Sequence, residues 1–267
     1  MKLFKLYPKS IDGQLNPNLN LMPSNINISA IALFTVFGLF STLPAIAENK
    51  TTVLFQPPSE SERPESTEGA ASRGGSSGQS GVCASDRVSQ SISSDRLNFT
   101  ALAPQRNYGL TTLEHPTLWI YLPQTSAKQA ILSIKQEGKT PHWQQSVSLT
   151  PKTGITGIKL SDDAPALEIN QNYQWAVILV CGDRPNPNDP VVTAWIKRID
   201  QLENGDSNSP ISGLEQAAVY ARQGIWYDAL NILVAQRSSL SNWQNIWGEY
   251  LQSGGLERFA KEPVILD

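Results

Sequence analysis

The chain has few of the residues that build metal and redox centres. Its 267 residues include two cysteines and two histidines. His115 and His142 have no ligand spacing to each other or to Cys83 and Cys181, and no C-x-x-C motif occurs. Zinc and haem sites need such spacing. The sequence therefore argues against both kinds of site, and we expect no cofactor.

The chain also lacks the glycine-rich motifs that hold phosphate groups, since neither G-x-G-x-x-G nor G-x-x-x-x-G-K-[ST] occurs. Charged residues make up 17% of the sequence, and the formal net charge is −3. Nucleic-acid binding depends on a basic face that neutralises phosphates. We therefore expect neither a nucleotide nor a nucleic acid as a partner.

Long apolar runs are missing as well. The run at residues 28–40 has 13 residues, fewer than the roughly 20 that span a bilayer. It follows a basic leader and precedes the small-residue site Ala45-Ile46-Ala47, as in a secretory signal peptide. We predict that residues 1–47 are this signal, cleaved after Ala47, and that the protein is exported to the periplasm, the outer envelope or the cell exterior.

The leader before this run is longer than usual, so an uncleaved N-terminal anchor is the alternative. In that case the signal segment is the only part of the chain that we expect to contact a membrane.

Cys83 and Cys181 both follow the predicted signal. Thiols tend to pair in the oxidising compartments that exported proteins reach. We predict a Cys83–Cys181 disulfide, which would close a loop of about 98 residues and contribute roughly 4 to 5 kcal/mol on a chain-entropy model. A metal pair or a reactive thiol is the alternative.

Residues 48–80 are rich in Glu, Ser, Pro and Gly. Such a composition buries too little apolar surface to offset the entropy of ordering, so we predict a disordered linker. Val53, Leu54 and Phe55 interrupt this composition. We interpret them as a stray apolar cluster, with a docking motif as the alternative.

From Leu97 to Ile199 the apolar residues recur at every second position, which indicates half-buried strands. Six or seven short strands predict an antiparallel β-sandwich of the immunoglobulin or fibronectin type over residues 81–203, with a small barrel as the alternative. The segment from Leu167 to Trp175 resembles a sandwich corner, in which a tyrosine hydroxyl hydrogen-bonds to upstream backbone.

After residue 210 the apolar residues recur with a period of 3.6, which predicts helices. Ser212 and Glu215 have the spacing of a capping box, and Gly224 ends the first helix. Ser241 and Gln244 repeat the box before the last helix.

The residues around Gly224, between the first two predicted helices, resemble the turn of a tetratricopeptide repeat, whose small and aromatic residues let two helices pack. Over residues 211–263 we therefore predict a helical module, made of a tetratricopeptide-like hairpin and one further helix and packed on the sandwich.

Two segments, Thr111–Tyr121 and Gly224–Ala229, carry a resemblance to a known family. Over roughly residues 83–263 the chain resembles the cyanobacterial exported family catalogued as domain of unknown function nine-two-eight. The resemblance implies a periplasmic or cell-surface setting. It implies no activity and no functional residues.

His115 is the one histidine with possible catalytic partners nearby, Glu114 and Thr111. No G-x-S-x-G elbow marks a nucleophilic serine. We interpret His115, which precedes a proline at a strand start, as a turn residue satisfied by backbone and assign no catalytic residue.

Four oxygen-bearing residues lie in the proline-rich loop "CGDRPNPNDP": Asp183, Asn186, Asn188 and Asp189. Calcium favours such ligands, but the same residues are ordinary turn formers. We prefer the turn interpretation and keep a weak calcium site as the alternative.

Five aromatic residues are candidates for stacking on a sugar or contacting a peptide: Trp119, Tyr121, Trp195, Trp226 and Tyr227. Large exposed apolar patches are rare on monomers, so we expect the helical module to cover Trp119 and Trp195, which point away from the predicted core of the sandwich.

These patterns together predict a non-enzymatic exported adaptor that contacts an envelope protein or polysaccharide. A carbohydrate-binding sandwich and an envelope hydrolase are the alternatives from other functional classes.

Overall fold

The computed structural model describes residues 51–59, 64, 82–88, 97–140, 142–150, 152–200 and 212–266. These residues all belong to one unit, Asn49–Asp267. The predicted signal peptide and most of the predicted linker lie outside the described residues. Among the residues described, no helix combines the length and the hydropathy needed to cross a membrane.

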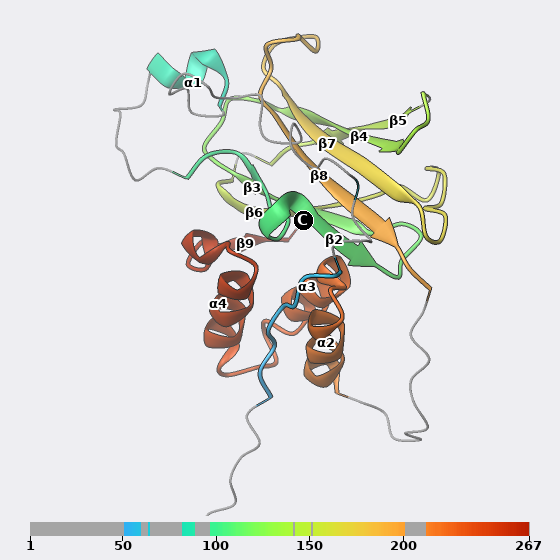
Figure 1. The fold of residues 1–267 in the computed structure, drawn as a ribbon. Helices are drawn as coiled ribbons and strands as arrows, with labels where there is room; N and C mark the ends of the chain where they lie inside the picture. The colour runs from blue at the N-terminus through green and yellow to red at the C-terminus, as the bar shows by residue number, and fades with distance from the viewer. Residues whose placement is uncertain are drawn as a thin grey trace, which may run out of the picture. The chain divides into compact units, whose positions relative to one another are not determined.

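The protein is mainly β, with two sheets and a group of C-terminal helices (Figure 1). The larger sheet has five strands in the order β2-β8-β7-β4-β5. Its strands are β2 (Tyr108–Thr111), β4 (Gln129–Gln136), β5 (His142–Ser148), β7 (Asn172–Val180) and β8 (Val191–Arg198).

The smaller sheet has four strands in the order β1-β3-β6-β9. Its strands are β1 (Thr100–Ala101), β3 (Thr117–Leu122), β6 (Gly154–Lys159) and β9 (Val264–Ile265).

Both sheets are mixed, so the prediction of purely antiparallel sheets is wrong. β2 pairs with β8 in parallel, and β6 pairs with β9 in parallel. Parallel neighbours need long connections between them, and both pairs meet this condition. In particular, β9 follows the helices and returns to the smaller sheet from the far end of the chain. A local period of two cannot reveal such pairings.

The residues between the sheets are the ones that alternate in the sequence. In β7, every second residue from Tyr173 to Leu179 is buried. In β4 the same holds from Ala130 to Ile134. These side chains and the apolar residues of the helices belong to one continuous buried cluster. The two sheets and the helices therefore share a single core.

The corner predicted from Leu167 to Trp175 is present. The backbone N–H of Glu168 donates a 3.0 Å hydrogen bond to the hydroxyl of Tyr173. The predicted disulfide is also confirmed, since Cys83 and Cys181 are bonded with their Cα atoms 5.4 Å apart. It joins the short helix α1 (Ala84–Val88) to the end of β7.

Three helices follow the sheets: α2 (Gly213–Arg222), α3 (Trp226–Ala235) and α4 (Trp243–Ser253). The capping box of Ser212 and Glu215 is present at the start of α2. The second predicted box is wrong, because Asn242 is the N-cap of α4 and no side-chain hydrogen bond caps this helix. Two 3-10 turns, η2 (Gln105–Asn107) and η3 (Glu257–Phe259), complete the elements.

Residues 51–59 differ from the predicted disordered linker. In Figure 1 this blue segment runs between α4 and α2. Its Val53 is fully buried and Phe55 is 6% exposed. The backbone N–H of Gln56 donates to the carbonyl of Ala221 at 2.9 Å, at the end of α2. Val53 and Phe55 of the cluster interpreted as stray are therefore packed in the protein, whereas Leu54 is 46% exposed, and this part of the predicted linker makes contacts that a disordered segment would lack.

Candidate functional site

A buried carboxylate lies where α3 meets the loop after β2. Asp228 is 4% exposed. Its Oδ1 accepts a 2.5 Å hydrogen bond from the hydroxyl of Thr111. Its Oδ2 accepts from the backbone N–H of Thr112 at 2.8 Å and from the hydroxyl of Thr112 at 2.6 Å. Three donors thus converge on one carboxylate, which links the helices to the larger sheet.

Burial and these hydrogen bonds act on Asp228 in opposite directions. Removal from water penalises the charged form and raises the pKa of the Asp228 carboxyl, while the bonds from Thr111 and Thr112 lower it and only partly offset the burial. Both threonines are themselves buried. The group therefore has the donors of a polar anchor and no access to a substrate.

A chain of aromatic hydrogen bonds lies beside this anchor. The indole N–H of Trp175 donates to the hydroxyl of Tyr227 at 2.9 Å, and that hydroxyl donates to the carbonyl of Trp195 at 3.1 Å. Tyr227 is fully buried, and this burial raises the pKa of its hydroxyl. The phenol thus joins α3 to β7 and β8 and has no role for an external ligand.

Trp226, the neighbouring residue of α3, is also fully buried. Its ring stacks on Tyr250 with a centroid distance of 4.6 Å and meets the edge of Phe55 at 5.0 Å. Its indole N–H donates to the carbonyl of Leu102 at 2.8 Å. All polar and apolar surfaces of this side chain are therefore occupied within the protein.

The outward side chains of β3 face the helices. Trp119 is 4% exposed and donates to the amide oxygen of Asn231 in α3 at 2.7 Å. A Cβ on Gly157 would lie 3.0 Å from the Trp119 ring, so the neighbouring strand leaves room for the indole. Tyr121 is 5% exposed and packs against Phe259.

Four of the five aromatic candidates are thus buried: Trp119, Tyr121, Trp226 and Tyr227. Trp195 is half-buried and packs against a small cluster of Tyr108, Leu110 and Ile225. Within the described residues, its indole N–H has no hydrogen-bond partner.

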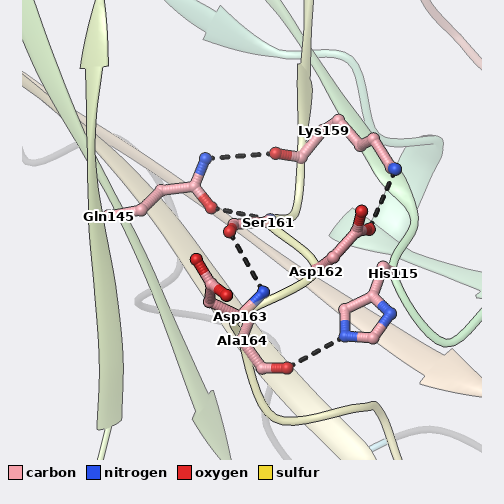
Figure 2. A network of polar contacts seen from close by, with 7 residues as sticks. All are labelled: His115, Gln145, Lys159, Ser161, Asp162, Asp163 and Ala164. Carbon is pink, nitrogen blue, oxygen red and sulfur yellow. Dashed lines mark hydrogen bonds and ion pairs between the residues drawn. The ribbon is translucent and has the colours of Figure 1, made fainter.

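His115 lies in a region of polar contacts, and its own hydrogen bond goes to a backbone carbonyl (Figure 2). The ring Nε2 donates to the carbonyl of Ala164 at 2.9 Å. Neither expected partner bonds to it, because Glu114 pairs with Arg198 at 3.0 Å and Thr111 bonds to Asp228. The interpretation of His115 as a turn residue accounts for these contacts.

The loop of the weak calcium candidates is closed by its own turn bonds. The backbone N–H of Asn186 donates to Asp189 Oδ2 at 2.8 Å, and that of Asn188 donates to Asn186 Oδ1 at 2.9 Å. Asp183 is exposed. Among the described residues, no group of three or more His, Cys, Asp or Glu side chains is arranged to hold a metal ion.

A different surface remains as a candidate site. We use "outer face" for six residues on the side of β4, β7 and β8 opposite the core. The register places its residues in two rows across the sheet. One row is Ile131, Ile178 and Val191, and the other is Ser133, Ala176 and Thr193.

All six residues of the outer face are half-buried, and none is charged. The outer face is therefore an uncharged patch on the three central strands of the sheet, and the next row along these strands is Lys135, Gln174 and Trp195. Sequence reasoning did not identify this surface, because cross-strand register is not readable from local alternation.

Sequence reasoning also missed Asp228 and Asn231. A signal was present, since both are polar residues on the apolar helix α3 and lie three positions apart, which places them on one face. Their partners, in β3 and the loop after β2, lie more than a hundred residues earlier, so no local pattern could identify them.

No curated protein matches the chain. Among solved structures, the chain is similar to the fn3 domain of human collagen alpha-1(XX) chain, with 11% identity and a TM-score of 0.25 over 46% of this chain and 98% of that chain.

The two segments that carried the sequence resemblance meet where α3 joins the larger sheet, because the hydroxyls of Thr111 and Thr112 donate to Asp228. The family model described as Domain of Unknown Function (DUF928) matches residues 68–264. The chain belongs to this family.

Proposed function

We propose that this protein is an exported, non-enzymatic interaction module that binds a protein partner on its outer face. The outer face carries the proposal because it is a continuous uncharged surface on a rigid sheet. Interface cores are depleted in charged residues, and pre-ordered strands lose little entropy on binding. The two rows, which contain Ile178 and Ala176 at their centres, have this composition.

The surrounding structure supports a fixed binding surface. β4 and β7 pair over eight residues, and β7 and β8 over seven. The disulfide of Cys181 closes the end of β7. A disulfide also suits the oxidising compartments that exported proteins reach, which supports the proposed export to the periplasm or the cell surface.

The proposal includes the finer fold assignment of a fibronectin-type sandwich with a tetratricopeptide-like hairpin. The corner bond to Tyr173 supports the sandwich. The tight turn at Gly224, with φ of 76° between α2 and α3, supports the hairpin.

The two alternatives have less support from the geometry. Carbohydrate binding would need exposed aromatic rings, and four of the five candidates are buried. A hydrolase would need a base that contacts a nucleophile or a carboxylate, whereas His115 bonds to the carbonyl of Ala164.

Site-specific photocrosslinking in the native envelope tests the proposal. A photoreactive residue at Thr193 lies on the outer face, and one at the exposed Asp163 is the control on the loop of Figure 2. We expect one discrete crosslinked partner from position 193 and none from position 163.

A charged substitution completes the test. Ile178→Lys should abolish the crosslink from position 193 while leaving the melting temperature close to that of the wild type, because the Ile178 side chain is on the half-buried face. Equal crosslinking from both positions, or a crosslink that survives Ile178→Lys in the folded protein, contradicts the proposal.

A further inference from the structure

The two sheets have four edges, and natural proteins protect such edges from pairing with other chains. Short edge strands, covering elements and charged residues are the usual means. Two of the edges here are short, because β1 and β9 have only two residues each.

The third edge, β2, is covered by the turn between α2 and α3. The backbone N–H of Leu110 donates to the carbonyl of Gly224 at 3.1 Å. A Cβ on Gly109 would lie 2.8 Å from the Cβ of Trp226, so the helix backbone approaches the strand as closely as a glycine allows. A second chain has no access to this strand.

In the part of the chain that the structure describes, the fourth edge, β5, has none of these protections. It has seven residues and ends the larger sheet. Within the described residues, β4 is the only strand that pairs with it. Its four outward residues, His142, Gln144, Ser146 and Ser148, are all exposed. No Lys, Arg, Asp or Glu occurs from His142 to Thr150.

We propose that β5 is a dimerisation edge, on which β5 of a second copy pairs antiparallel about a two-fold axis at Gln145. Residues directly opposite each other in such a pair point to the same face. In this register Trp143 lies opposite Val147 of the second copy, and Gln144 lies opposite Ser146 of the second copy. Apolar residues therefore meet apolar residues on the core side, and polar residues meet polar residues on the outer side.

The central residue is compatible with this axis. The Gln145 amide donates to the carbonyl of Lys159 at 3.1 Å and accepts from the backbone N–H of Ser161 at 2.9 Å (Figure 2). Its side chain is thus satisfied within its own chain. Gln145 of one copy therefore needs no hydrogen bond to Gln145 of the other. The pairing also opposes no two like-charged residues, because β5 contains no Lys, Arg, Asp or Glu.

A second copy fits this edge better than a charged peptide does, because an isologous pair matches the strand with itself. Pro141 and Pro151 flank the strand in the sequence. Proline cannot donate to a sheet ladder, so pairing ends within the strand. The two-fold pairing uses the β5 edge of both copies and therefore closes at two copies. The dimer would carry a continuous sheet with two outer faces side by side. This inference does not depend on the proposed function.

The test is the mass of the full chain after export, measured by sedimentation equilibrium over a roughly hundredfold range of protein concentration. We expect a reversible monomer–dimer equilibrium. A folded protein that stays monomeric over the whole range overturns the proposal.

Two double variants test the register. Gln144→Lys with Ser146→Lys places like charges opposite each other twice, and should raise the dissociation constant about tenfold or more. Gln144→Glu with Ser146→Lys places opposite charges at the same two positions and should restore the dimer. Equal dissociation constants for the two variants overturn the proposal.

Disulfide trapping gives a second readout that does not depend on charge. Directly opposed Cα atoms lie about 4.5 to 5.5 Å apart, within the range of a disulfide. Gln145→Cys should therefore crosslink two copies under oxidising conditions. Gln144→Cys is the control, because this residue is offset from its own copy and should not crosslink. A crosslink from position 144 and none from position 145 contradicts the register.

Discussion

The junction between the helices and the sheets differs from the outer face and the β5 edge. At the junction, each polar group of Asp228, Tyr227 and Trp226 has a partner, and the side chains are buried. On the outer face and at β5, residues are half-buried or exposed. The aromatic residues at the junction are therefore used for internal packing, whereas the outer face is made of small and aliphatic residues.

This difference has a consequence for reading function from composition. Trp, Tyr and His are the residues that most often suggest a binding or catalytic site. Here these residues hold the β-sheets and the C-terminal helices together, as Trp119 of β3 does through Asn231 of α3. The six residues of the outer face include none of these residue types, whereas the β5 edge includes His142 and Trp143.

The largest contrast is expected between two tryptophans. Trp226→Ala removes a fully buried indole with its stacking partner and its hydrogen bond to Leu102, and should lower the free energy of unfolding by about 4 kcal/mol. Trp195→Ala removes a half-buried indole whose N–H has no partner among the described residues, and should cost about half as much. Urea unfolding of both variants measures the difference, and equal losses would contradict it.

The polar anchor gives the next contrast. Asp228→Ala leaves the hydroxyls of Thr111 and Thr112 and one backbone N–H without an acceptor, and should cost about 3 kcal/mol. Ser133→Ala on the outer face should stay within about 0.5 kcal/mol of the wild type. Thermal unfolding checks both, and a neutral Asp228→Ala would show that the anchor contributes nothing to holding the helices.

A glycine pair gives a smaller contrast. Gly224 has φ of 76°, and a Cβ there would lie 2.9 Å from Pro58 of the packed N-terminal segment. Gly224→Val should therefore cost about 2 to 3 kcal/mol, through backbone strain and displacement of that segment. Gly182→Val is the control, because its Cβ meets no atom within 4 Å and its φ is unstrained. Equal melting temperatures for the two variants would contradict this account.

Much of the fold could be predicted, because it depends on local patterns. The alternation in β7, the capping box at Ser212 and the pairing of the two cysteines are each set by neighbouring residues or by composition. The parallel pairing of β2 with β8 and of β9 with β6 could not be predicted, since it depends on which distant segments lie side by side.

The candidate surfaces escaped prediction for the same reason. The outer face exists only because the register aligns Ile131, Ile178 and Val191 from three strands. The packing of Phe55 on Trp226 joins residues that are far apart in the sequence. A composition typical of disorder surrounds Phe55 in the sequence, so its contact with the helices could not be anticipated there.

The smallest effect compares the pH dependence of a buried and an exposed carboxyl. Burial raises the pKa of Asp228 above its ordinary value of 3.8, so the folded protein binds this proton more tightly than the unfolded chain does. The stability contributed by its protonation is fully present below pH 3.8 and is lost as the pH rises through the folded pKa. Relative to Asp228→Asn, the wild type should therefore become more stable as the pH falls.

Asp162 should show the opposite sign. Its hydrogen bond and charge interaction with Lys159 lower the pKa of the Asp162 carboxyl below 3.8. The stability from this pair is present above pH 3.8 and is lost as the pH falls through the lowered pKa. Because both groups are exposed, the effect of Asp162→Asn should be barely measurable and should vanish in high salt. Chemical unfolding of the two variants at a series of pH values compares the slopes. Slopes of the same sign would mean that the three donors to Asp228 outweigh its burial, and that the junction holds a charge as readily as the surface does.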